Sequence, residues 1–176
     1  MSGEEFSHSH ITSIGVDKSY CKRIVRDTEI EVTAWDTVGQ EKYRSVPKML
    51  YRDAQCILLI YDITDWSTFE KINSWIEDIR ENTSAAKTPI ILVGNKLDLI
   101  TTIGRNVNKE DGKELADKYD LSFFEVSAKD LDNIEEMFDE LIKQAYDFAV
   151  KLGGNSETLR ISRRRSQEKN KNKNRK

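Results

Sequence analysis

Short apolar runs alternate along the chain with stretches in which apolar residues recur every three or four positions. The runs Tyr20–Val25 and Ile30–Trp35 are rich in β-branched and aromatic residues and flank a short polar segment, which predicts an antiparallel hairpin. Cys56–Tyr61 and Ile90–Val93 are apolar throughout, which predicts strands buried on both faces of a parallel sheet. Leu121–Val126 is expected to be a last, short strand.

Stretches with helical spacing separate these runs. A first stripe predicts a helix that opens with Ser67 and Glu70 as a capping box, and its apolar positions are Phe69, Ile72, Trp75, Ile76 and Ile79. A second stripe near the end of the domain consists of Ile134, Met137, Phe138, Leu141, Ile142, Ala145 and Phe148. Lys109–Tyr119 predicts a weaker third helix. Alternating strands and helices predict an α/β fold with a Rossmann-like, doubly wound and mostly parallel sheet.

Length and charge predict one domain with a distinct tail. The 176 residues carry 28 basic and 31 acidic side chains, for a net charge of −3. Arg160–Lys176 holds nine Lys or Arg and one acid, a net +8, so the rest of the chain carries −11. We expect a flexible N-terminus over residues 1–10, a domain over 11–152 and a disordered basic tail over 153–176. The tail is expected either to be a solvated end or to make weak contact with an anionic membrane.

Asn95-Lys96-Leu97-Asp98 directly follows a predicted buried strand. Ligands of doubly wound sheets bind at the carboxyl ends of the strands. A carboxylate there can accept hydrogen bonds from N1–H and the exocyclic amine of guanine, a pair of donors that adenine does not offer. Such charge-assisted bonds contribute about 1.5–3 kcal/mol each. The Lys96 stem can cover the ring face, and Asn95 can tie the loop to its neighbours.

Ser127-Ala128-Lys129 follows the last predicted strand and can supply a backbone N–H to guanine O6. Each of the two segments could also be an ordinary polar loop at a strand end. Because they follow neighbouring strands in the right order, the two together predict a guanine-base pocket.

Asp36-Thr37-Val38-Gly39-Gln40 ends the second strand of the predicted hairpin. An aspartate at a strand end can hold Mg²⁺ through water, and a glycine N–H can approach a phosphate closely because no Cβ intervenes. A glutamine can orient an attacking water. A turn with a surface glutamine is the alternative interpretation of this segment.

Together these segments resemble the small GTPases of the Ras superfamily, and the Rab branch most of all. The similarity spans about residues 11–150 and includes Ile11–Asp17, which resembles switch I, and Tyr61–Thr64. It implies binding of GTP or GDP with Mg²⁺, with Ser13 and Asp36 as metal ligands. It also implies that Gly39 lies near the γ-phosphate and that Gln40 orients the attacking water.

The resemblance further implies a switch in vesicle and protein transport that meets Rab effectors or regulators through the switch segments. The resemblance also implies that the protein is cytoplasmic and peripheral on endomembranes. The C-terminus carries no prenylation cysteine, and the two cysteines of the chain, Cys21 and Cys56, suggest a reducing compartment.

Members of this family begin with a strand, a Gly-x-x-x-x-Gly-Lys-Ser/Thr phosphate loop and a helix, yet only ten residues precede Ile11. We therefore expect a domain that lacks its first strand, P-loop and first helix. Losing about five charge-assisted bonds at about 1.5–3 kcal/mol each would weaken nucleotide binding by about five or more decades. The strands at Ile30–Trp35 and Cys56–Tyr61 are expected to have open edges.

Three functional hypotheses follow. The first is a working GTPase in which a longer product supplies the missing segment. The second is a pseudoGTPase that acts as an interaction module without nucleotide turnover. The third is a nucleic-acid-associated protein that uses its basic tail, and it is the least favoured because the tail has no interleaved aromatic residues for base stacking.

Overall fold

The computed structural model describes residues 17–36, 54–83 and 88–153. They belong to two compact units, one comprising Met1–Lys42 and Ala149–Lys176 and the other Tyr43–Phe148. The predicted N-terminus over residues 1–10 and nearly all of the predicted tail lie outside the described residues.

The first unit contains the predicted hairpin. Strands β1 (Asp17–Val25) and β2 (Thr28–Asp36) pair antiparallel, with Val25 opposite Thr28 at the turn. Arg26 and Asp27 form the turn and both have positive φ, 46° and 62°. Two such residues match the right-handed twist of the strands in a two-residue hairpin. The hairpin prediction is confirmed, with strands slightly longer than expected.

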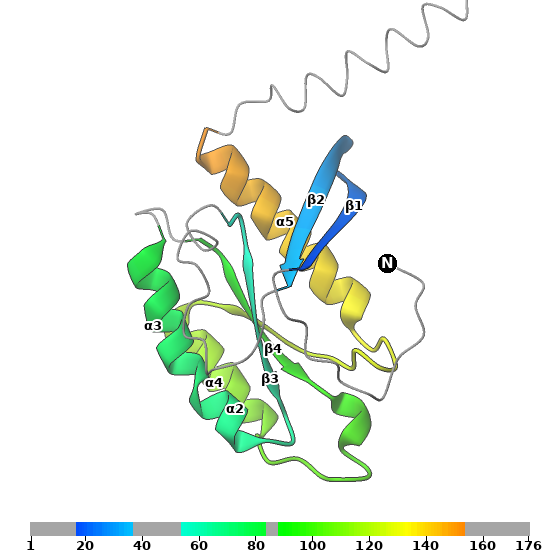
Figure 1. Ribbon diagram of the computed structural model, residues 1–176, viewed down its shortest axis with the longest axis vertical. Helices are drawn as coiled ribbons and strands as arrows, with labels where there is room; N and C mark the ends of the chain where they lie inside the picture. Colours follow the sequence, from blue (N-terminus) through cyan, green and yellow to red (C-terminus); the bar gives the residue numbers. More distant parts are fainter. Residues whose placement is uncertain (1–16, 37–53, 84–87, 154–176) are drawn as a thin grey trace, which may run out of the picture. The chain divides into compact units, whose positions relative to one another are not determined.

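The second unit holds a parallel three-stranded sheet in the order β3-β4-β5 (Figure 1). Its elements in chain order are β3 (Ile57–Asp62), α2 (Trp66–Glu70), α3 (Ile72–Asn82), β4 (Ile90–Asn95), a 3₁₀ turn (Leu97–Leu99), α4 (Lys109–Tyr119), β5 (Ser122–Glu125) and α5 (Ile134–Lys151), whose residues after Phe148 are assigned to the first unit. This alternation of strands and helices confirms the α/β, doubly wound prediction.

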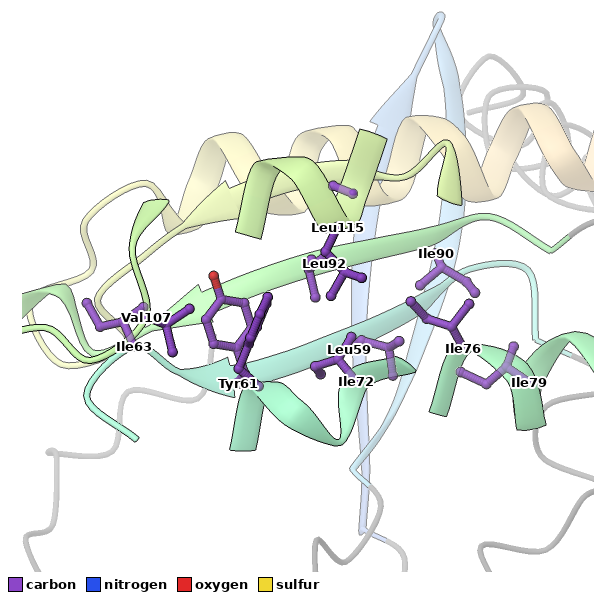
Figure 2. Packing of buried hydrophobic residues seen from close by; sticks show 12 residues of the cluster. Leu59, Tyr61, Ile63, Ile72, Ile76, Ile79, Ile90, Leu92, Val107 and Leu115 are labelled. Carbon is purple, nitrogen blue, oxygen red and sulfur yellow. The ribbon is translucent and has the colours of Figure 1, made fainter. Parts of the chain in front are cut away.

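Helices cover both faces of this sheet. On one face, side chains of β3 and β4 meet the stripe of α2 and α3 and part of α4; Figure 2 shows Leu59, Leu92 and Ile76 among them. On the other face, Ile91 and Val93 pack against Ile134 and Met137 of α5. The central strand β4 is consequently buried along nearly its whole length. Among the described helices, none is long and apolar enough to cross a membrane.

Two details differ from the sequence predictions. The helical stripe is divided between α2 and α3 at Lys71, and α2 is capped by Asp65, whose carboxylate accepts the Ser67 N–H at 2.9 Å. The predicted capping box was therefore wrong, because Asp65 stands one residue ahead of the first turn and takes the capping position.

The expectation that the β3 run is buried on both faces was also wrong in part. Ile60 is 57% exposed, whereas its partner in register, Val93 of β4, is 1% exposed. Within the described residues β3 is paired on one side only, as is β2. Both strands therefore present one edge without a strand partner in this part of the chain.

Candidate functional site

Three loops follow the carboxyl ends of the parallel strands in the second unit. β3 ends at Asp62, β4 at Asn95 and β5 at Glu125, and Asp62 lies opposite Asn95 in the register of the sheet. Parallel strands bring these ends to one edge of the sheet. The Ser127–Lys129 loop and the Asn95–Asp98 loop consequently meet there.

Asn95 ties two of the loops together. Its Oδ1 accepts the N–H of Lys96 at 2.8 Å and the N–H of Ala128 at 3.0 Å. The N–H of Leu97 donates to the carbonyl of Val126 at 3.1 Å and adds a backbone link between the same loops. The amide that could serve a base oxygen is therefore engaged by Asn95 in this structure.

Asp98 lies at the junction of the two loops. The Ser127 hydroxyl donates to its Oδ1 at 2.8 Å, and the Lys129 ammonium lies 3.9 Å from its Oδ2. Ser127 is fully buried and its Oγ also accepts the Asp130 N–H, at 3.0 Å. The Asp98 side chain is only 8% exposed, so its carboxylate is held in one orientation. Such a fixed acceptor suits a pair of hydrogen-bond donors on a flat ring.

Lys96 has a left-handed backbone, with φ 77° and ψ 38°. Its ammonium lies 2.5 Å from Oδ2 of Asp62, while the other oxygen of Asp62 accepts the Thr64 N–H at 2.8 Å and the Thr64 hydroxyl at 2.6 Å. Burial raises the pKa of the Asp62 carboxyl. The hydrogen bonds from Lys96 and Thr64 outweigh that effect and bring the pKa below its ordinary value. Asp62 is therefore a charged, oriented member of the site.

Asp62 was not among the candidate site residues predicted from sequence. The signal that could have found it is the Asp-x-Thr pattern at the end of an apolar run, which is typical of a side-chain-stabilised turn. Its position at the same sheet edge as Asn95 then places it beside the base loop.

An ion pair to a buried carboxylate supports the loop after β5. Arg105 binds both oxygens of Glu125, whose side chain is 6% exposed, and also donates to the carbonyl of Val107 at 3.1 Å. The carbonyl of Glu125 accepts the side-chain amide of Asn133 at 2.9 Å. This pair fixes the strand end two residues before Ser127, and the sequence analysis missed it.

The structure thus brings together Asn95, Lys96, Asp98 and the Ser127–Lys129 segment. The residues predicted to contact the phosphates, the attacking water or Mg²⁺ are not placed with them. Asp36 is the exposed last residue of β2, in the other unit, and Ser13, Gly39 and Gln40 lie outside the described residues. The described parts of the chain hold no group of three or more His, Cys, Asp or Glu side chains placed to bind a metal. The Mg²⁺ ligands remain a prediction.

Comparison with known proteins gives one consistent family. The model of the Ras family matches residues 2–147. Ras-related protein Rab-13 of Canis lupus familiaris is 38% identical over 151 residues, which cover 86% of this chain and 71% of the relative. Ras-related protein Rab-2B of Dictyostelium discoideum is 39% identical over 141 residues, covering 80% and 68%.

Ras-related protein SEC4 of Candida albicans is 38% identical over 138 residues, covering 78% of this chain and 64% of the relative. The family match covers every described strand and the edge at which Asn95, Asp98 and Ser127 meet. The chain therefore belongs to the Ras family of small GTPases and is Rab-like within it.

Proposed function

We propose that this protein is a guanine-nucleotide-binding switch of the Rab type that acts in vesicle and protein transport. The observation that carries the proposal is the oriented Asp98 carboxylate, held by Ser127 beside a loop tied through Asn95. A buried acceptor that matches two donors on one base edge rejects bases that leave it unpaired. Guanine presents those donors and adenine does not.

The Asp98 carboxylate would accept N1–H and the exocyclic amine of guanine. The Ser127–Lys129 segment would donate a backbone N–H to O6, with the Ala128 N–H exchanging Asn95 for the base. The Lys96 stem would lie over the ring. Asp36 and Ser13 would hold Mg²⁺, Gly39 would approach the γ-phosphate, and Gln40 would orient the attacking water.

The switch segments would meet Rab effectors or regulators, and the protein would be cytoplasmic and peripheral on endomembranes. The +8 tail would add a weak electrostatic contact with anionic lipid, at about 1 kcal/mol per basic residue near the surface. These statements rest on membership of the family and on the charge of the tail.

The test is calorimetric titration of the purified chain with GDP, GTP, adenosine diphosphate and xanthosine diphosphate, in the presence and absence of Mg²⁺. The Asp98→Asn variant replaces one acceptor oxygen with a donor, so it matches the carbonyl that xanthine carries where guanine has its amine. We expect GDP binding to weaken by about 100-fold or more, because one bond of about 1.5–3 kcal/mol is lost, the other is no longer charge-assisted, and the new side-chain amide faces the guanine amine, donor against donor. Binding of xanthosine diphosphate should strengthen.

Asp139→Asn is the matched control, since it removes an exposed carboxylate on α5 outside the three loops. It should leave both affinities unchanged. Equal binding of guanosine and adenosine diphosphates by the unmodified chain would refute the proposal. Guanine-specific binding without phosphate release from GTP would instead favour the pseudoGTPase hypothesis.

A further inference from the structure

We propose that Asp62 is a positioning residue of the base site: its carboxylate keeps the Lys96 ammonium away from Asp98, so that Asp98 stays available to guanine. This inference rests on the proposed function and assigns a specificity role to a residue of the β3 end.

Four charged side chains lie at this edge of the sheet. Two lysines, Lys96 and Lys129, and two carboxylates, Asp62 and Asp98, are paired one to one. Lys96 lies 2.5 Å from Asp62, and Lys129 lies 3.9 Å from Asp98. Lys96 precedes Asp98 by only two residues on the same turn, and a lysine ammonium on its flexible four-carbon stem can change partner readily. Asp62 therefore decides which carboxylate Lys96 meets.

The partner of Lys96 matters because Asp98 can accept only a limited number of hydrogen bonds. An ionised carboxylate has about four acceptor sites. The Ser127 hydroxyl uses one of them in this structure, the Lys129 ammonium lies 3.9 Å from Oδ2, and N1–H and the amine of guanine would use two more. A second ammonium within hydrogen-bonding distance of Asp98 would compete with the base for the acceptor sites that Ser127 leaves. Pairing Lys96 with Asp62 removes the competitor.

Asp62 is built to hold its position. The Thr64 amide and hydroxyl both donate to Oδ1, which leaves Oδ2 for the lysine. Its side chain is 16% exposed, against 44% for Lys96, so the carboxylate is the fixed partner and the lysine the mobile one. The backbone of Asp62 is further anchored by its N–H, which donates to the Thr68 hydroxyl at 3.0 Å.

The experiment compares the affinities for guanosine and inosine diphosphate. Hypoxanthine, the base of inosine, lacks the exocyclic amine and therefore donates one hydrogen bond fewer to Asp98. In Asp62→Asn we expect GDP affinity to fall about tenfold, which corresponds to about 1.4 kcal/mol. Inosine diphosphate affinity should fall less, so the preference for guanine shrinks. Adding Lys96→Met to Asp62→Asn removes the competing charge and keeps an apolar stem, and we expect it to restore the preference. A merely structural role for Asp62 would not be rescued by changing Lys96.

Asp65→Asn is the matched control, because Asp65 is a nearby carboxylate and asparagine is also a good helix N-cap. It should leave the ratio of the two affinities unchanged. An unaltered ratio in Asp62→Asn, or failure of the double variant to restore it, would overturn the inference while leaving the proposed function intact.

A second measurement does not depend on nucleotide. A crystal structure of the full-length Asp62→Asn variant, without nucleotide, should show the Lys96 ammonium within about 4 Å of the Asp98 carboxylate, the range of an ion pair. A Lys96 side chain directed into solvent there would contradict the inference, even for a chain that binds no nucleotide. If the unmodified chain does not bind guanine nucleotides, that result would count only against the proposed function.

Discussion

Tyr61 limits the size of its neighbours in the core at two positions. It is 2% exposed, and its hydroxyl lies 2.9 Å from where a Cβ would stand on Gly94 and closer still to where one would stand on Gly112. The ring of Phe123 closes the same space around Gly112, at 2.7 Å. Burial raises the pKa of the Tyr61 phenol above its ordinary range, so the ring is neutral and functions as packing. Figure 2 shows Tyr61 within this layer of the core.

We predict that Gly112→Ala destabilises the protein by about 1–3 kcal/mol, because the added methyl overpacks the space between Tyr61 and Phe123. In a helix interior free of such contacts, the same change would stabilise by about 0.5–1 kcal/mol. Urea unfolding followed by circular dichroism measures the difference. Tyr61→Phe removes the atom in closest contact and should reduce the loss in a double variant. A more stable Gly112→Ala chain would show that the core relaxes around the methyl.

At the scale of elements, the N-terminus of α2 allows a test of which residue caps the helix. Asp65 caps the helix through the Ser67 N–H, whereas the sequence predicted that Ser67 and Glu70 do so. We predict that Asp65→Ala lowers the free energy of unfolding by about 1 kcal/mol, the usual cost of losing a cap. Glu70→Ala should change it by less than about 0.5 kcal/mol, as an ordinary surface substitution does. Equal losses from the two variants would restore the predicted capping box.

Element type was predictable because continuous apolar runs mark strands of the second unit and apolar residues at helical spacing mark its helices. Lys109–Tyr119 is a helix with the expected ends, and its start shows a capping box formed by Asn108 and Asp111. The division of the stripe at Lys71 was not predictable, since the apolar spacing continues across it. Burial also depends on neighbours that the period does not reveal. Ile60 and Val93 occur in similar apolar runs, but only the strand of Val93 is flanked on both sides.

The candidate site shows the same limit. Asn95 and Asp98 were predicted as site residues because their residue types, in that order after a buried strand, suit a guanine base, and the structure places them at one edge of the sheet, while their role stays a prediction. The ion pair of Lys96 with Asp62 joins the loop after one strand to the last residue of another, as does that of Arg105 with Glu125. Such pairs depend on strand register and side-chain direction, which a single sequence does not specify.

At the scale of the whole molecule, the two units differ in how their backbones are protected. The sheet of the second unit is covered by helices on both faces, and five of the six residues of β4 are buried. In the hairpin of the first unit, every residue from Ser19 to Asp36 is at least partly exposed. An isolated two-stranded hairpin is marginally stable in water. The two sheets should therefore open with different free energies.

We predict that hydrogen exchange separates the units. Amides of β4 should exchange only through global or near-global opening, whereas amides of β1 and β2 should exchange at least about 100-fold faster through local opening. Exchange followed by mass spectrometry on peptides that cover Ile90–Asn95 and Thr28–Asp36 measures the ratio. Comparable protection of the two segments would contradict the prediction, because it would require the exposed side of the hairpin, with Tyr20 and Ile24, to be covered in solution. Slower amide exchange in β1 and β2 after addition of GDP would indicate that nucleotide binding stabilises the first unit, where Asp36 is proposed to hold Mg²⁺.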